Sequence, residues 1–250
     1  MLPSIKIFTD FDGTITVNDV GDAMFERFGG SRCSEYIGQY WKGLISAAEC
    51  FRKESAQCGE VDKNVLDKFL DSQPIDQSFI PFIGFCKSNA IDLAIFSDGM
   101  EYYIRRILDR NGAGDVPFFS NVLHLESVTG SASVTFVPEF PYESESCDRC
   151  ACCKRNIMLT HSDDDDILIC IGEGYSDRCP VKYADIVFAK DSLIEYCTSE
   201  GLPFYEYSSF NDISERLQQL ILLHETKPSK TRLHKRRQAQ LARREVFIGE

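Results

Sequence analysis

Two aspartates near the N-terminus have the spacing needed to act together on a phosphate ester. Asp10 and Asp12 follow a short apolar run, and Gly13 and Thr14 complete a tight turn behind them. Hydrolysis of a phosphate ester requires a nucleophile, a proton donor for the leaving oxygen and positive charge around the phosphoryl oxygens. Asp10 is suited to attack phosphorus, and Asp12 to protonate the leaving oxygen and then activate water.

The same aspartates have a simpler interpretation as a helix N-cap and a solvated turn acid, because short motifs often match by chance. Two further polar segments favour the catalytic interpretation. Ser97-Asp98-Gly99 follows the apolar run 91–96, and a segment containing Glu173 and Asp177 follows the run 167–171. Ligands of open α/β sheets bind beyond the carboxyl ends of the strands, so these segments are expected to meet there.

Hydrophobic periodicity indicates which elements position these residues. Apolar faces at 19–30, 34–49 and 65–70 predict an all-helical segment. After it, the pattern predicts helices at 79–86, 101–110 and around Ile213–Ile221, a β-hairpin at 116–126 and 133–137, and strands at 5–8, 91–96, 167–171 and 186–188. Strands that alternate with helices predict an α/β fold with a mostly parallel, Rossmann-like sheet. We expect a core at 1–16 and 74–225, an inserted helical cap at 17–73 and a basic tail at 226–250.

Composition limits the classes of function. The formal charge of −12 argues against a nucleic-acid-binding protein, although the tail from Thr226 carries 8 Lys/Arg and 2 Asp/Glu. No apolar stretch approaches the roughly 20 residues of a membrane span. The 11 cysteines are an odd number in a long chain without an evident export signal, which favours a reducing, cytoplasmic compartment.

At this point the motifs resemble those of the haloacid-dehalogenase superfamily in its phosphatase form, with an insertion similar to the type I helical cap. The resemblance runs over residues 5–225 and implies roles for later residues. Ser97 would bind a phosphoryl oxygen, Lys154 would neutralise the nucleophile and phosphate, and Glu173 and Asp177 would hold Mg²⁺ together with Asp10 and Asp12. Substrate contacts are expected from Thr14, Asp19, Asp98 and Gly99, although Asp19 is equally well explained as a helix N-cap.

Glu173 departs from the family pattern, which usually has aspartate at this position. Glutamate keeps the charge but is one methylene longer, and Mg²⁺ requires near-ideal octahedral geometry. Two arrangements therefore remain open. Either Glu173 binds the ion directly after a small backbone adjustment, or it binds through water while Asp177 contributes more.

A cysteine-rich run, Cys147, Cys150, Cys152 and Cys153, directly precedes Lys154. Its spacing allows a zinc site, but the adjacent cysteines are awkward for one tetrahedral ion, so a redox-sensitive or simply packed loop is favoured. The run also resembles that of methylthiopentenyl-phosphate, phosphoethanolamine/phosphocholine and pyridoxal-phosphate phosphatases.

These observations predict a Mg²⁺-dependent phosphomonoester hydrolase that acts on a small phosphorylated metabolite through an aspartyl-phosphate intermediate. Two alternatives remain, a phosphomutase of the same fold and a non-catalytic binding protein. The basic tail is interpreted as a solvated or disordered end rather than a site for an anionic partner. Trp41 and the other aromatic residues of the cap are interpreted as its core.

Overall fold

The structure is a computed structural model that describes residues 4–144, 149–227 and 232–248. The chain forms two compact units. The first contains Met1–Asp10, Asp76–Ile95 and Lys154–Glu250, and the second contains Phe11–Ile75 and Phe96–Cys153. The chain therefore passes between the units directly after Asp10 and again directly before Lys154.

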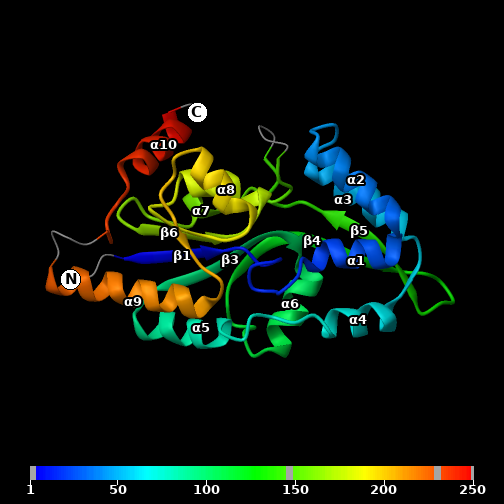
Figure 1. Ribbon diagram of the computed structural model, residues 1–250. Coiled ribbons are helices and arrows are strands. Elements are labelled where there is room, and N and C mark those ends of the chain that lie inside the picture. Colours follow the sequence, from blue (N-terminus) through cyan, green and yellow to red (C-terminus); the bar gives the residue numbers. More distant parts are fainter. Residues whose placement is uncertain (1–3, 145–148, 228–231, 249–250) are drawn as a thin grey trace. The chain divides into compact units, whose positions relative to one another are not determined.

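The first unit is built on a parallel sheet with the strand order β3-β1-β6-β7-β8. Its strands are β1 (Ile5–Thr9), the first part of β3 (Asp92–Met100), β6 (Ile167–Gly172), β7 (Ile186–Ala189) and β8 (Tyr205–Glu206). Helices α5 (Phe79–Ser88) and α9 (Phe210–Thr226) lie on one face of the sheet, and α7 (Lys154–Thr160) and α8 (Ser192–Ser199) lie on the other (Figure 1). Every residue of β6 is buried, as expected for a strand covered on both faces.

The register of this sheet aligns the carboxyl ends of its central strands. Thr9 at the end of β1 is paired with Ile95 of β3 and with Ile171 of β6. The Asp10 amide extends the ladder by one bond, donating to the Ile171 carbonyl at 2.9 Å. Asp10 therefore comes one residue after the paired level of Thr9 and Ile171, and Glu173 comes two residues after it. Two short 3₁₀ helices, Tyr175–Arg178 and Pro180–Lys182, follow Glu173 in the chain.

The second unit combines helices with antiparallel strands in the order β2-β5-β4, next to the second part of β3. Its elements are α1 (Val20–Gly29), α2 (Ser31–Trp41), α3 (Ala47–Cys58), β2 (Val61–Asp62), α4 (Lys63–Asp71), α6 (Glu101–Arg110), β4 (Phe118–Ser127) and β5 (Ser133–Glu139). Helix α3 packs on β5, and α6 packs on β4. The helical insertion expected at 17–73 thus lies wholly within this unit, which also contains residues 96–153.

The predicted α/β fold with a mostly parallel sheet and a helical insertion is confirmed, and α6 has the predicted bounds. The single helix expected over 34–49 is wrong. Helix α2 ends at Trp41, Gly43 adopts a left-handed φ of 67°, and α3 begins after Ser46, whose hydroxyl accepts the Glu49 amide proton at 3.1 Å. The apolar period runs across this break, so periodicity alone did not reveal it.

The interpretation of the tail as a solvated or disordered end is also wrong for its described residues. Residues Arg237–Ile248 form helix α10, and Leu233 and Ala239 are buried. The Arg236 guanidinium donates to the carbonyls of Val181, Lys182 and Ala184, and Arg243 forms an ion pair of 2.7 Å with Asp185. The basic residues therefore attach the tail to the first unit.

The interpretation of Trp41 as cap core is wrong as well. Trp41 is 65% exposed and Leu44 is 69% exposed, whereas the buried aromatic of this region is Phe25, which packs against Phe51 and Phe136. Trp41 is the last residue of α2. No helix in the described ranges is long and apolar enough to cross a bilayer.

Glu54 is an unusual member of the cap interior because its side chain is buried in α3. Its Oε1 atom has no hydrogen-bond partner among the described residues. Burial raises the pKa of Glu54 to about 8, and the charges of Asp22 and Asp19 on α1 add to the rise, while a hydrogen bond with Cys50 opposes it. Cys33 on α2 and Cys58 on α3 also face this carboxyl group. Glu54 therefore remains protonated in the folded protein at neutral pH.

We predict that Glu54→Gln stabilises the protein progressively as pH rises from 5 to 8. The unfolded carboxyl group ionises near its ordinary pKa, so the folded state binds more protons in this window and wild-type stability falls with pH, by up to about 1.4 kcal/mol per pH unit. Glutamine removes this loss because it does not titrate. Urea unfolding followed by circular dichroism at several pH values measures the free energy of unfolding of the wild type and the variant. The exposed Glu49→Gln change on the same helix is the control, and an equal stability difference at all pH values would contradict the prediction.

Candidate active site

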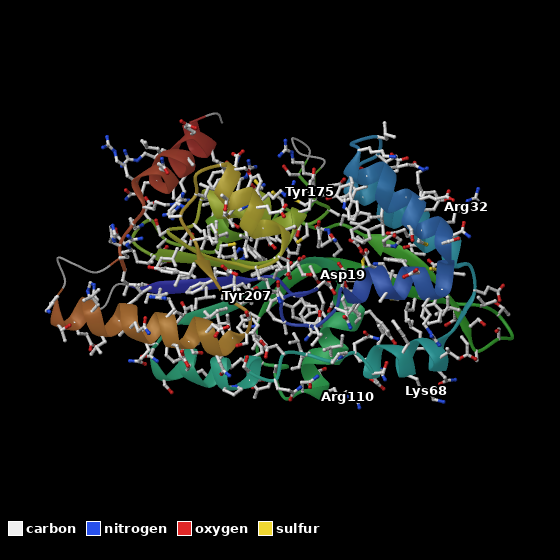
Figure 2. All side chains as sticks on the ribbon, in the orientation of Figure 1. Asp19, Arg32, Lys68, Arg110, Tyr175 and Tyr207 are labelled. Atoms are coloured by element: carbon white, nitrogen blue, oxygen red, sulfur yellow. The ribbon has the colours of Figure 1, made fainter. Side chains whose placement is uncertain are left out.

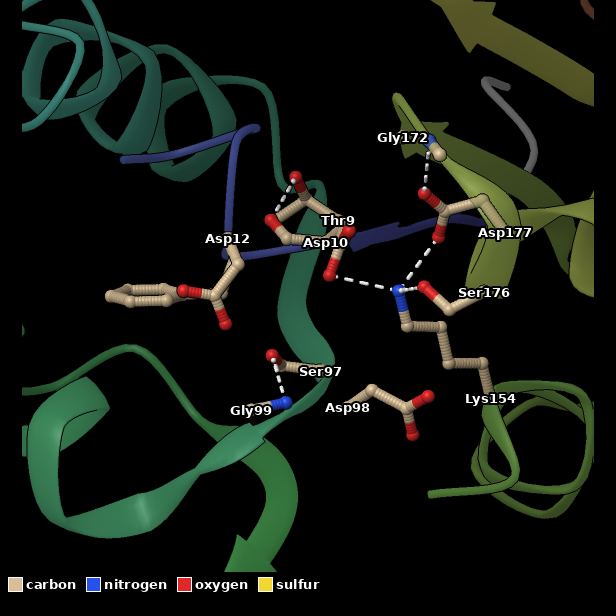
Figure 3. Close-up of polar contacts among 12 residues, drawn as sticks. Thr9, Asp10, Asp12, Ser97, Asp98, Gly99, Lys154, Gly172, Ser176 and Asp177 are labelled. Atoms are coloured by element: carbon tan, nitrogen blue, oxygen red, sulfur yellow. Dashed lines mark hydrogen bonds and ion pairs between the residues drawn. The ribbon is translucent and has the colours of Figure 1, made fainter. Parts of the chain in front are cut away.

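A fully buried lysine lies between two carboxylates in the first unit (Figure 3). Lys154 is the first residue of α7, and its Nζ atom is 2.8 Å from Asp10 Oδ1 and 2.8 Å from Asp177 Oδ1. It also donates to the Ser176 hydroxyl at 2.8 Å. Burial alone would lower the pKa of Lys154, but the charges of Asp10 and Asp177 outweigh it and raise this pKa well above its ordinary value. The lysine is therefore a permanent positive charge beside Asp10.

Asp177 is held by the turn that follows β6. Its second oxygen, Oδ2, accepts the amide protons of Glu173 at 3.0 Å and Gly174 at 3.3 Å. Gly172 leaves room for this arrangement, since a Cβ atom there would come within 2.3 Å of the Asp177 carboxylate. Glu173 is half-buried in this turn, and its backbone carbonyl accepts the Leu193 amide proton at 2.8 Å.

The donor set of the first unit suits Mg²⁺ in its chemistry. Asp10, Glu173 and Asp177 supply oxygen ligands of the kind that the ion prefers, and Lys154 offsets only one of their three negative charges. In the described part of the chain, no group of three or more His, Cys, Asp and Glu side chains is arranged to hold a metal ion. The assignment of metal ligands therefore stays a prediction.

Asp12 lies in a separate network within the second unit. The Tyr103 hydroxyl on α6 donates to Asp12 Oδ2 at 2.6 Å, and the Val20 amide at the start of α1 donates to Oδ1 at 3.0 Å. Burial raises the pKa of Asp12 well above its usual value, and the charge of Asp19 contributes in the same direction, while these two hydrogen bonds oppose the rise. Both carboxylate oxygens are thus engaged here, which gives no support to Asp12 as a side-chain metal ligand.

The second part of β3 brings Ser97 and Gly99 together in the second unit. Ser97 is fully buried, and its Oγ atom accepts the Gly99 amide proton at 2.9 Å. A Cβ atom on Gly99 would lie 2.1 Å from the Tyr103 hydroxyl and 2.4 Å from Asp12 Oδ2. Gly99 therefore leaves the space in which Tyr103 meets Asp12, a role different from the substrate contact expected of it.

Two of the other predicted substrate-binding residues, Asp19 and Asp98, make structural hydrogen bonds. Asp19 caps α1, with Oδ1 accepting the Asp22 amide proton at 2.8 Å (Figure 2). Thr14 is buried, and its hydroxyl has no hydrogen-bond partner within the described ranges. The Asp98 carboxylate accepts the Cys152 amide proton at 2.6 Å. The capping interpretation of Asp19 is confirmed, whereas substrate contact by these three residues is untested.

The cysteine-rich run is a packed segment where it is described. Cys150, Cys152 and Cys153 are buried, and Cys147 lies outside the described residues. Ala151 packs against Ala47 and Ala48 of α3, and the Tyr40 hydroxyl on α2 donates to the Arg149 carbonyl. The segment therefore belongs to the interior of the second unit and leads directly to Lys154.

Sequence reasoning missed Tyr103 and Ser176. Tyr103 is the third residue of the predicted helix 101–110, where its spacing is that of an ordinary core aromatic residue. Only its buried hydroxyl distinguishes it from such a residue. Ser176 lies one residue before Asp177, so its adjacency to a predicted metal ligand was the available signal.

Comparison with known proteins decides the family. Residues 5–194 match the family model described as Putative Phosphatase. The chain belongs to this family. It is a phosphatase of the haloacid-dehalogenase type, as the motifs indicated.

The chain is also similar to individual proteins at low sequence identity. The chain is 27% identical to a 2-hydroxy-3-keto-5-methylthiopentenyl-1-phosphate phosphatase of Exiguobacterium sibiricum, over 86% of this chain and 97% of that protein. It is 30% identical to Pdp3-interacting factor 1 of Schizosaccharomyces pombe, over 86% and 96% of the two chains. A phosphoserine phosphatase with a phospho-aspartyl intermediate analogue superposes with a TM-score of 0.65 at 16% identity, covering 86% and 99%. That structural likeness establishes the fold alone.

We predict that Gly99→Ala lowers the phosphatase kcat by roughly 10- to 100-fold, a loss no larger than the usual contribution of a general acid, about 10²- to 10⁴-fold. The new methyl group must displace Tyr103 or Asp12, because the space it needs is already filled. Hydrolysis of p-nitrophenyl phosphate measures the effect. Gly38→Ala on α2, where a Cβ atom meets nothing within 4 Å, is the matched control. Unchanged kcat in Gly99→Ala would show that the Tyr103–Asp12 contact is not needed.

Proposed function

We propose that the chain is a Mg²⁺-dependent phosphomonoester hydrolase in which Asp10 forms an aspartyl-phosphate with a small phosphorylated metabolite. The observation that carries the proposal is the ion pair between Asp10, directly after β1, and the fully buried Lys154. A carboxylate beside a positive charge, at the carboxyl end of a parallel sheet, supports the proposal of a nucleophile that attacks a phosphate group.

In the first step an Asp10 oxygen attacks phosphorus, and the bond from phosphorus to the leaving oxygen breaks. Asp12 gives its proton to that oxygen, which departs as an alcohol. Two residues of chain span at most about 7 Å, so Asp12 is held within reach of the same phosphoryl group. Ser97 and Lys154 bind the phosphoryl oxygens and stabilise the charge that develops on them.

In the second step Asp12 removes a proton from water, which attacks the phosphorus of the aspartyl-phosphate. The bond to Asp10 breaks, inorganic phosphate leaves, and both aspartates return to their starting states. Asp10, Glu173 and Asp177 would hold Mg²⁺. When bound, the ion supplies positive charge that offsets repulsion between the carboxylates and the phosphate dianion.

The substrate is proposed to be a small phosphorylated metabolite because the inserted cap is small and helical. The names of the relatives suggest 2-hydroxy-3-keto-5-methylthiopentenyl 1-phosphate and phosphoserine as first candidates. Phosphocholine, phosphoethanolamine and pyridoxal phosphate complete the panel, since the cysteine-rich run is similar to that of their phosphatases. Release of inorganic phosphate from one member of this panel would identify the substrate.

We predict that Asp10→Asn abolishes hydrolysis of p-nitrophenyl phosphate, because an amide cannot form the acyl phosphate. Acid quenching of the wild type with ³²P-labelled substrate should trap a hydroxylamine-sensitive phosphoenzyme, and the variant should trap none. Circular dichroism confirms that the variant is folded. Normal turnover by Asp10→Asn would overturn the proposed role of this residue.

Measurement of released inorganic phosphate distinguishes the hydrolase from the phosphomutase and the non-catalytic binding protein. A hydrolase releases free inorganic phosphate, a phosphomutase returns the phosphoryl group to the organic product, and a binding protein does neither. EDTA should stop the wild-type reaction, and added Mg²⁺ should restore it.

We predict that Glu173→Asp keeps or improves activity, whereas Glu173→Ala raises the Mg²⁺ concentration needed for half-maximal rate. Aspartate retains the charge and restores the shorter reach that is usual at this position. A Mg²⁺ titration of the rate measures the effect in each variant. If Glu173→Ala titrated like the wild type, Glu173 would not be a metal ligand.

A further inference from the structure

We infer that Asp98 is a positioning residue that holds the chain segment leading to Lys154, rather than a residue that contacts the substrate. The inference rests on the proposed function of Lys154. Its central observation is the bond of 2.6 Å from the Cys152 amide to Asp98 Oδ1. Cys152 stands two residues before Lys154, so this bond fixes the backbone within about 7 Å of the lysine.

The segment needs such a partner because it is buried. Cys150, Ala151, Cys152 and Cys153 are each at most 6% exposed, so their amide groups have little access to water. The Cys153 amide donates to the Tyr142 carbonyl at 2.8 Å, and the Cys152 amide donates to Asp98. A buried amide that loses its acceptor is destabilised, and the chain around it rearranges to find another.

Asp98 is itself anchored from the other side. Its carbonyl accepts a hydrogen bond of 2.6 Å from Asn121 Nδ2 on β4, and Asn121 is fully buried. The hydroxyl oxygen of the preceding residue, Ser97, accepts the Gly99 amide proton within the same strand. Asp98 thus connects the second part of β3 and β4 to the cysteine-rich segment.

The opposite end of that segment is also held within the second unit. The Arg149 carbonyl accepts from Tyr40, and Ala151 packs against α3. The Asp98 contact lies between this end of the segment and α7, two residues before Lys154. Because Lys154 is the first residue of α7, a shift of Cys152 is passed to the lysine through two peptide units.

Asp98→Ala and Asp98→Asn test the inference, since asparagine keeps an oxygen acceptor and alanine does not. Hydrogen–deuterium exchange of the peptide over 149–154 reports on the bond without any need for activity. We expect exchange at Cys152 to accelerate at least 10-fold in Asp98→Ala and 2- to 5-fold in Asp98→Asn. Asp92→Ala, at the exposed start of the same strand, is the control and should exchange like the wild type.

Kinetics with probes that lack a specific leaving group separate positioning from substrate recognition. We expect the Ki of inorganic phosphate to rise about 10-fold in Asp98→Ala, and kcat/KM for p-nitrophenyl phosphate to fall about 10- to 100-fold, with most of both recovered in Asp98→Asn. A residue that reads only the leaving group would leave the phosphate Ki unchanged.

Each outcome bears on a distinct claim. A wild type that fails to hydrolyse p-nitrophenyl phosphate in Mg²⁺ counts against the proposed function, while the exchange measurement still reports on the Asp98 bond. Unchanged exchange at Cys152 in Asp98→Ala overturns the inference, and so does a wild-type phosphate Ki in that variant. If the alanine variant does not fold, the smaller changes in Asp98→Asn decide, and their absence overturns it.

Discussion

The pairing of Lys154 with Asp10 and Asp177 is the interaction on which the rest of the candidate site depends. A lysine with no exposed surface is tolerated only when its charge is matched by nearby carboxylates, because an unpaired buried charge costs several kcal/mol. This requirement explains the neighbouring features. The aligned ends of β1 and β6 deliver Asp10, the turn after β6 presents Asp177, and Gly172 has no side chain that would displace it.

Two aspartates that are only two residues apart have opposite surroundings. Asp10 faces a buried cation in the first unit, whereas Asp12 is desolvated in the second and lies near the charge of Asp19. One environment favours an ionised carboxylate and the other a protonated acid, which is the division that a nucleophile and a proton donor require. The boundary between the units falls between these residues, so each carboxylate takes its character from a different part of the fold.

Local sequence patterns predicted the elements and missed the contacts between them. The apolar runs identified β1, β6, β7 and α6, and the polar residues after the runs identified Asp10, Ser97, Glu173 and Asp177. The apolar period continues across the break at Gly43, and strand β8 has only two residues, so periodicity revealed neither. The contacts of Tyr103, Asp98 and Arg236 join residues 23 to 91 positions apart, which no spacing rule encodes. The basic composition of the tail predicted a solvated or disordered end. In the structure, the Arg236 guanidinium instead donates hydrogen bonds to backbone carbonyls and attaches the tail to the fold.

The exposed position of Trp41 has a practical consequence for spectroscopy. It is the only tryptophan of the chain, and it already lies largely in water at the end of α2. Its emission should therefore change little when the polypeptide denatures and would be a poor monitor of unfolding. The same indole is well placed to respond to soluble quenchers, or to any molecule that covers this end of the helix, and so offers an intrinsic fluorescent reporter of that surface.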